Sequence, residues 1–290
     1  MTQVQANRAQ RWWQSEAQTK GVKGYLHPLQ AKGLEALLGQ QQKMGIQGAL
    51  AEIGVYQGKT LIGLVRDSQS GERVVGVDPL RLGSSDLWPG LMRNLDQHLL
   101  GEERQRLKIV RRLSTDLSVA DWMAELGQPA RLVHLDGHHA RDTILHDLRL
   151  ASSYLVEGGV VVLDDFLNEL HPDLTRGMLE GLMAHAHLEP VAVVPRVGHI
   201  EEGGSKLVCV TRGAADAYLK ALDAAFTGSL RPWQDALLGR PVRVYRHPMP
   251  TAAASENRAK GESLTLGQSS IGRQVVTKDS AQAPQPIPPI

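Results

Sequence analysis

Two apolar runs of the chain end abruptly in acidic residues. Residues 131–135 lead into Asp136, and residues 159–163 lead into Asp164 and Asp165. Neither run alternates between apolar and polar positions, which is typical of strands buried on both faces of a parallel sheet. Between them, apolar residues recur at helical spacing and a glycine pair follows. The pattern predicts a strand–helix–strand crossover, so both acidic ends lie at the same edge of a sheet.

Further predicted helices and strands alternate along the chain. Helical spacing is found after Pro28 and within residues 89–100, 119–126, 172–186 and 214–226, and short strand-like runs cover residues 48–53, 73–77, 107–110, 191–194 and 207–211. Strands alternating with helices are typical of α/β folds. We therefore expect a doubly wound (Rossmann-like), mostly parallel, seven-stranded sheet with helices on both faces. The last two strands are expected to form an antiparallel hairpin at one edge.

The two ends of the chain differ in composition from the middle. Residues 1–44 are expected to form an N-terminal arm, with a Trp12–Trp13 pair, and a capping helix that begins at Pro28. Residues 45–248 form the predicted α/β domain. Residues 249–290 are rich in Ser, Gly, Gln, Ala and Pro, which predicts a disordered low-complexity tail. The arm is a candidate surface for docking on the domain or on a second subunit, so a homodimer is one expectation.

Composition excludes several classes of partner. The formal net charge of +1 creates no overall field that favours nucleic acid or an anionic membrane. No segment has the apolar length of a signal peptide or a membrane span, so we expect a soluble, cytoplasmic protein. The single cysteine, Cys209, excludes an internal disulfide. It lies in an apolar run and is expected to be a buried structural thiol.

A glycine-containing turn follows the first predicted strand with the spacing Glu52-x-Gly54-x-x-x-Gly58. Glycines between a strand and a helix let a ligand approach the backbone, and the helix N–H groups then point at that ligand. The turn lacks the third glycine of the dinucleotide-binding fingerprint. Asp78 ends the second strand, where an acid can accept hydrogen bonds from a ribose diol. Glu52 is expected to support the turn and the amino-acid end of a ligand.

The acidic residues that follow residues 131–135 and 159–163 suggest a metal site. Carboxylates of Asp136, Asp164 and Asp165 would repel one another unless protons or a cation neutralised them. A set of oxygen ligands favours Mg²⁺, with Mn²⁺ also suitable. We therefore predict that these three residues hold a hard divalent ion.

These features, taken in their order along the chain, resemble the class I S-adenosylmethionine-dependent methyltransferases. More narrowly, residues 45–212 are similar to the metal-dependent O-methyltransferases of sugars and small molecules, of the macrocin and aminocoumarin type, and more distantly to the catechol type. The resemblance implies S-adenosylmethionine and Mg²⁺ or Mn²⁺ as cofactors. It implies a metal site of Asp136, Asp164 and Asp165, and a cofactor site of Glu52, Gly54, Tyr56, Gly58, Asp78 and Ser114.

One departure from these families concerns the catalytic base. Sugar-modifying members often carry an acid two residues after the first metal ligand, where this chain has His138; His139 follows, where catechol-type enzymes place a lysine. The unperturbed pKa of histidine lies close to working pH, so either histidine is a sensible general base. His134, within the strand, is expected to be a hydrogen-bonded core residue. His146 and Asp147 are expected on a solvated helix face.

The predicted function is therefore an S-adenosylmethionine-dependent, divalent-metal-dependent O-methyltransferase that acts on a hydroxyl of a small molecule or sugar. Acceptor specificity is expected in residues 79–100 and 166–176 and in the N-terminal arm. Two alternatives stay open. One is a metal-independent methyltransferase on the same fold, and the other is a catalytically inactive methyltransferase-fold protein that binds a partner.

Overall fold

A computed structural model describes residues 3–196, 198–199, 201 and 203–248. The tail predicted for residues 249–290 lies outside the described residues. Among the helices of the described residues, none combines the length and the apolar character that a membrane span requires.

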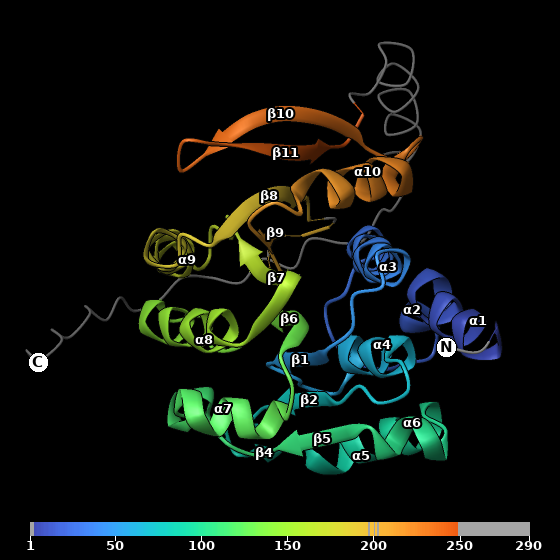
Figure 1. Cartoon of the computed structure of the whole chain (residues 1–290). Coiled ribbons are helices and arrows are strands. Elements are labelled where there is room, and N and C mark those ends of the chain that lie inside the picture. The colour runs from blue at the N-terminus through green and yellow to red at the C-terminus, as the bar shows by residue number, and fades with distance from the viewer. Residues whose placement is uncertain (1–2, 197, 200, 202, 249–290) are drawn as a thin grey trace, which may run out of the picture. The chain divides into compact units, whose positions relative to one another are not determined.

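The domain is organised around a nine-stranded sheet with the order β10-β11-β8-β9-β7-β6-β1-β2-β5 (Figure 1). The run from β5 to β7 is parallel, β9 is antiparallel to both β7 and β8, and β11 pairs parallel with β8 and antiparallel with β10. The strands are β1 (Ala49–Ile53), β2 (Val74–Val77), β5 (Leu107–Val110), β6 (Ala130–Leu135), β7 (Leu155–Phe166), β8 (Leu188–Val194), β9 (Ser205–Thr211), β10 (Arg231–Leu237) and β11 (Arg240–Arg246).

All seven predicted strands are present, but the predicted strand number and the position of the edge hairpin are wrong. The pair β8–β9 lies inside the sheet, because β11 pairs with β8 through Arg243 and Val244. The edge is formed by the β10–β11 hairpin. The sequence pattern does not predict β10, because this strand is exposed along almost its whole length and has no buried apolar face. Edge strands tolerate such polar sequences and proline, which β10 contains.

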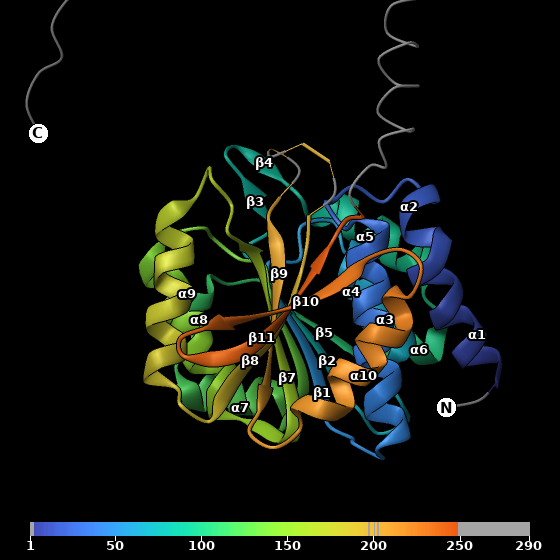
Figure 2. The same ribbon diagram turned by 90° about the horizontal axis from the view of Figure 1, so that it is seen from above.

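Helices cover both faces of the sheet, as predicted (Figure 2). On one face lie α7 (Val119–Leu126), α8 (Arg141–Ser153) and α9 (Pro172–Ala184). The other face carries α3 (Pro28–Lys43), α4 (Lys59–Asp67), α5 (Trp88–His98), α6 (Gly101–Gln105) and α10 (Ala215–Phe226). Alternate residues of a strand enter the two cores. In β1, for example, Leu50 packs with the second group and Ala51 with the first.

The N-terminal arm packs on its own domain through the tryptophan pair. It consists of α1 (Gln3–Arg11), a π-helical turn (Trp12–Glu16) and α2 (Ala17–Thr19). Trp12 is fully buried and donates to the carbonyl oxygen of Lys59 at 3.0 Å, and the buried Trp13 donates to the Asp67 carboxylate. Gly63 of α4 leaves the room for the Trp13 ring. The pair is therefore covered within the chain and gives no support to the expected homodimer.

Two smaller features complete the fold. The connection after β2, expected as a loop, contains two-residue strands, β3 (Arg81–Leu82) and β4 (Ser85–Asp86), which pair with each other. Cys209 on β9 is fully buried, as predicted, and burial raises the pKa of its thiol above the usual range. The carboxyl ends of β1, β2, β6 and β7 line one cavity.

Candidate active site

A cavity of about 850 Å³ lies at the carboxyl ends of the central strands. This is the edge at which open α/β sheets bind ligands. The structure brings all the predicted site residues except Gly58 into its lining: Glu52, Gly54, Tyr56, Asp78, Ser114, Asp136, His138, His139, Asp164 and Asp165.

The glycine turn after β1 depends on two residues with positive φ. Gly54 (φ 90°) lies against the main chain of Asp136, and any Cβ at residue 54 would overlap the Asp136 carbonyl oxygen. This contact lets the ends of β1 and β6 approach closely. Gly58 (φ 87°) precedes α4, and a Cβ there would come within 2.8 Å of Leu91 Cδ1. Gly58 therefore serves helix packing at the turn, which agrees with its place outside the cavity lining.

Asp78 holds the glycine turn in place from the end of β2. Its Oδ2 accepts hydrogen bonds from the backbone N–H groups of Val55 at 2.7 Å and Tyr56 at 2.8 Å, and its Oδ1 accepts from Leu80 N at 2.6 Å. Tyr56 has a left-handed backbone (φ 49°), which costs free energy in a residue other than glycine. Asp78 is the residue whose hydrogen bonds stabilise that conformation beside the cavity.

A buried chain of polar side chains runs from β1 to β9. His134 Nδ1 lies 3.0 Å from Glu52 Oε1, and His134 Nε2 lies 3.0 Å from Lys206 Nζ, which also donates to Asp164 Oδ2. His134 is fully buried, which confirms its predicted role as a hydrogen-bonded core residue. Burial raises the pKa of Glu52, against the effect of His134. Among the described residues, Glu52 Oε2 has no hydrogen-bond partner.

Sequence reasoning missed Lys206. It is only 2% exposed and places an ammonium group beside the acidic corner. The signal was a lysine at the start of the apolar run that forms β9, where a charged residue is costly unless it is paired.

The three predicted metal ligands, Asp136, Asp164 and Asp165, lie in different electrostatic environments. Burial, and after it the Asp164 carboxylate, raises the pKa of Asp136 well above its usual range. Burial also opposes ionisation of Asp164, but the Lys206 ammonium and the His134 imidazole together outweigh it and hold the pKa of that carboxyl below its usual range. Asp136 is therefore the carboxylate whose charge the protein compensates least.

Asp165 is paired with His139. His139 Nε2 lies 3.0 Å from Asp165 Oδ2, and this hydrogen bond raises the pKa of the imidazole. Burial opposes ionisation of Asp165, but His139 and the hydrogen bond from Asn168 together lower its pKa overall. Two further residues, missed from the sequence, support the pair: Asn168 Nδ2 donates to Asp165 Oδ1 at 2.9 Å, and the His171 ring lies 4.4 Å from that of His139.

The donors at this corner fit a divalent cation. Asp136 belongs to two groups of potential ligand atoms, one with His134 and Asp164 and one with His139 and Asp165, and the atoms of each group lie within 4.8 Å of one another. Each group combines carboxylate oxygens with an imidazole nitrogen. The three predicted aspartates thus lie within ligand distance of His134 or His139, which the predicted oxygen-only set did not include.

The other predicted residues lie around the cavity. His138 is exposed, and Ser114 is buried and accepts from His146 Nε2 at 3.0 Å through its backbone oxygen. The expectation of a solvated face at His146 and Asp147 is wrong. Asp147 is 1% exposed, because α8 packs against the turn that contains Ser114, and burial raises the pKa of Asp147 to about 7 despite a hydrogen bond from Ser114.

The N-terminal segment closes one side of the cavity. Residues 23–26 and Gln30 contribute to its lining. Lys59 Nζ donates to the carbonyl oxygen of Gly24 at 2.6 Å, and Gln30 Nε2 donates to that of Gly204 at 3.0 Å. The arm is thus connected both to the start of α4 and to the segment before β9.

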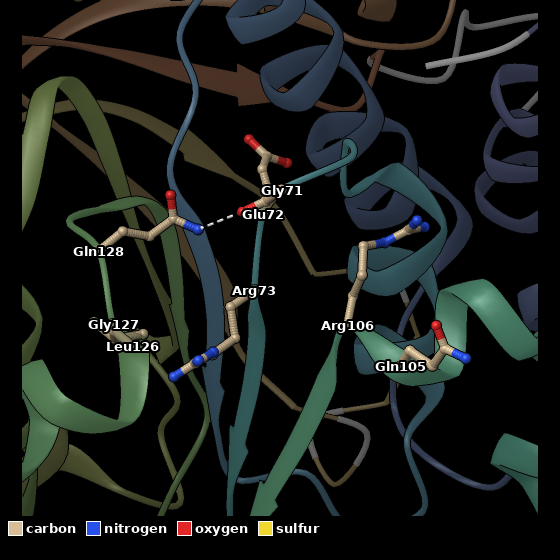
Figure 3. A pocket seen from close by; sticks show the side chains of 8 residues that line it. All are labelled: Gly71, Glu72, Arg73, Gln105, Arg106, Leu126, Gly127 and Gln128. Carbon is tan, nitrogen blue, oxygen red and sulfur yellow. Dashed lines mark hydrogen bonds between the residues drawn. The ribbon is translucent and has the colours of Figure 1, made fainter.

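A second hollow, of about 420 Å³, lies at the opposite end of the sheet, where β2 and β5 begin (Figure 3). Gln128 Nε2 spans it and donates to the carbonyl oxygen of Gly71 at 3.1 Å. The side chains of Arg73 and Arg106 point away from each other. None of the predicted site residues lines this hollow.

Comparison with known proteins matches part of the chain to a described family. Residues 51–166 match the family model described as "Methyltransferase domain". Among curated proteins, the chain is 26% identical over 116 residues to the uncharacterized protein R132 of Acanthamoeba polyphaga mimivirus. The match covers 40% of this chain and 50% of that protein, so the chain spans about half the length of the curated relative it matches.

Solved structures have the same fold. The O-methyltransferase from Bacillus cereus, in complex with S-adenosylhomocysteine, matches with a TM-score of 0.51 at 16% identity, over 73% of this chain and 92% of that chain. TomG from Streptomyces achromogenes, an O-methyltransferase of tomaymycin synthesis in complex with S-adenosylmethionine, matches with a TM-score of 0.50 at 18% identity, over 73% and 91%. Residues 51–166 therefore match a methyltransferase domain, and the chain has the fold of these two O-methyltransferases, which agrees with the resemblance seen in the sequence.

Proposed function

We propose that this protein is an S-adenosylmethionine- and divalent-metal-dependent O-methyltransferase that acts on a hydroxyl group of a small molecule or sugar. One observation carries the proposal. A single cavity of about 850 Å³ is lined by the glycine turn and Asp78 and also by Asp136, Asp164 and Asp165. A methyl donor and an acceptor hydroxyl can therefore bind next to each other.

The donor would bind at the glycine turn. Asp78 orders that turn through Val55 and Tyr56 and lies where a ribose diol would be bound. Glu52 lines the cavity and has one buried oxygen without a hydrogen-bond partner among the described residues, and this oxygen would suit the ammonium group of the methionine moiety. Ser114 lies beyond β5 and would approach the adenine. The cofactor complexes of the two similar solved structures support this assignment.

The acidic corner would hold the ion. Asp136, Asp164 and Asp165 lie at the ends of adjacent strands, and the raised pKa of Asp136 shows that its ionised form is under-compensated. When bound, a divalent ion there would orient an acceptor hydroxyl and favour its ionised form. His138, exposed in the cavity wall, would accept the hydroxyl proton. Because a sulfonium methyl is already reactive, most of the acceleration would come from holding donor and acceptor together.

A second candidate is a metal-independent methyltransferase on the same fold. The observation that favours it is Lys206, whose buried ammonium already neutralises part of the acidic charge through Asp164. In that case His139 and Lys206 would supply the positive charge in direct contact with Asp164 and Asp165. The two candidates differ in whether an added ion changes turnover.

The test combines binding with transfer. Purified protein should bind S-adenosylhomocysteine in calorimetry, and a trideuterated methyl donor should transfer mass to members of a panel of catechols and nucleotide sugars when Mg²⁺ or Mn²⁺ is present. Excess EDTA should abolish transfer and leave S-adenosylhomocysteine binding in place. Undiminished transfer in EDTA would establish the metal-independent candidate, and the absence of cofactor binding would contradict both candidates.

A further inference from the structure

Both oxygens of the Asp164 carboxylate are already engaged within the protein. Oδ2 accepts from Lys206 Nζ, and Oδ1 accepts from the backbone N–H of Asp165 at 2.9 Å. Lys206 is 2% exposed and also lies 3.0 Å from His134 Nε2. Removing Asp164 from this pair would leave a buried ammonium without its counter-ion, which is strongly unfavourable. One of the two potential ligand groups, His134 with Asp136 and Asp164, thus already contains a cation of the protein itself.

The second group is arranged differently. His139 Nε2 and Asp165 Oδ2 are 3.0 Å apart, and Asp136 completes the group within 4.8 Å. Two ligands bound at right angles to one ion, with bonds of about 2.1 Å, lie about 3 Å apart. The pair therefore already has the separation of neighbouring ligands in a coordination shell.

The surroundings fix the orientation of Asp165. Its Oδ1 accepts from Asn168 Nδ2 at 2.9 Å and from the backbone N–H of Gly204. This leaves Oδ2 directed to His139. Hydrogen bonds to the second oxygen of a carboxylate ligand are the usual means by which proteins orient such ligands.

From this geometry we propose that the divalent ion is coordinated by Asp136, His139 and Asp165, and that Asp164 serves as the counter-ion of Lys206. The inference rests on the metal dependence proposed above. It changes the expected ion, because one imidazole with two carboxylates favours Mn²⁺ or a later transition metal over Mg²⁺. It also separates the roles of the adjacent histidines, with His139 as a ligand and His138 as the proton acceptor.

The experiment uses the full chain and Mn²⁺ alone, without methyl donor or acceptor. Protein freed of metal by a chelator and dialysis is titrated with Mn²⁺, and the bound ion is studied by pulsed electron paramagnetic resonance. We expect nitrogen hyperfine coupling from a directly bound imidazole. His139→Ala should abolish that coupling and weaken Mn²⁺ binding at least tenfold, whereas His138→Ala, the neighbouring control, should preserve both.

A second pair of variants tests the role of Asp164. Asp165→Asn should weaken Mn²⁺ binding at least tenfold. The double variant Asp164→Asn with Lys206→Met removes the internal ion pair as a unit and should keep the Mn²⁺ affinity within about threefold. The spectrum of the unaltered protein tests whether any imidazole binds the ion even if a variant fails to fold, and the His139→Ala spectrum tests which imidazole it is.

Three results would overturn the assignment: no Mn²⁺ binding, bound Mn²⁺ without nitrogen coupling, or nitrogen coupling that survives His139→Ala. Failure of the proposed function looks different. Nitrogen coupling that depends on His139, in a protein that methylates no acceptor, would support this ligand set and contradict the methyl transfer.

Discussion

Gly54 lies directly against the main-chain carbonyl of Asp136, so the turn that is proposed to bind the methyl donor packs on the start of the acidic corner. Gly54→Ala would place a Cβ on that oxygen. Both partners are backbone, so neither can move aside by changing a rotamer. We expect a loss of several kcal/mol in the free energy of unfolding, measured by urea denaturation.

The matched control is Gly71→Ala. Gly71 has a similar φ of 84°, but a Cβ there has open space around it. Gly71→Ala should lower the free energy of unfolding only by the strain of a left-handed alanine, about 1–2 kcal/mol. Equal losses in the two variants would show that the contact between Gly54 and Asp136 contributes nothing.

Asp78→Asn should weaken the binding of S-adenosylhomocysteine at least tenfold. An amide has a single acceptor oxygen, so it cannot accept from Val55, Tyr56 and Leu80 with the geometry that the carboxylate uses. Calorimetry measures the affinity. Asp116→Asn, an exposed acid after β5, should bind like the unaltered protein, and a similar affinity for Asp78→Asn would remove Asp78 from the cofactor site.

The buried Asp147 predicts a pH dependence of stability. Its pKa is raised to about 7 in the folded protein and returns to 3.8 on unfolding, so between these values the folded state holds a proton that the unfolded state has lost. The contribution of Asp147 to the free energy of unfolding therefore falls as pH rises from about 4 to about 7, by up to about 4 kcal/mol. Asp147→Asn should remove this loss and be more stable than the unaltered protein at pH 8.

Thermal unfolding at pH 4 and pH 8 measures the effect. The difference in Tm between the variant and the unaltered protein should be larger at pH 8 and small at pH 4. A difference that is the same at both values would mean that Asp147 ionises normally in the fold.

Trp13→Phe should destabilise the attachment of the arm. The ring remains apolar, but Asp67 loses the indole donor, and a buried acceptor without its donor costs about 1–3 kcal/mol. Trp233→Phe is a control, because Trp233 is half exposed on β10 and should change stability by less than about 0.5 kcal/mol. If the two variants unfold at the same urea concentration, the arm is not held by this hydrogen bond.

The sequence predicted the central strands and the place of the site because both depend on local pattern. Apolar runs ending in Asp78, Asp136 and Asp164 locate strand ends without knowledge of tertiary contacts. By contrast, β10 has no buried apolar face that could indicate a strand, and the position of the β10–β11 hairpin depends on the pairing of β11 with β8.

The partners inside the site could not be predicted for a related reason. Lys206 and Asn168 reach the acidic corner from β9 and from the segment after β7, and nothing in their local sequence reveals which acid they contact. Asp147 was misjudged because burial of one side of α8 depends on the turn at Ser114, which lies more than thirty residues earlier. The local sequence pattern gives the positions of the acidic residues, but the residues that neutralise their charges are brought together only by tertiary contacts.

The pairing of β11 with β8 also bears on how much of the chain is needed. The family resemblance ends near residue 212, yet a protein shortened there would lose the hairpin whose residues Arg243 and Val244 pair with Ala192 and Val193. The backbone amide and carbonyl groups of β8 that pair with β11 would then be free to bind strands of other molecules. We therefore expect the hairpin to protect β8 from such pairing, and a chain that ends near residue 212 should precipitate at concentrations at which the 290-residue chain does not.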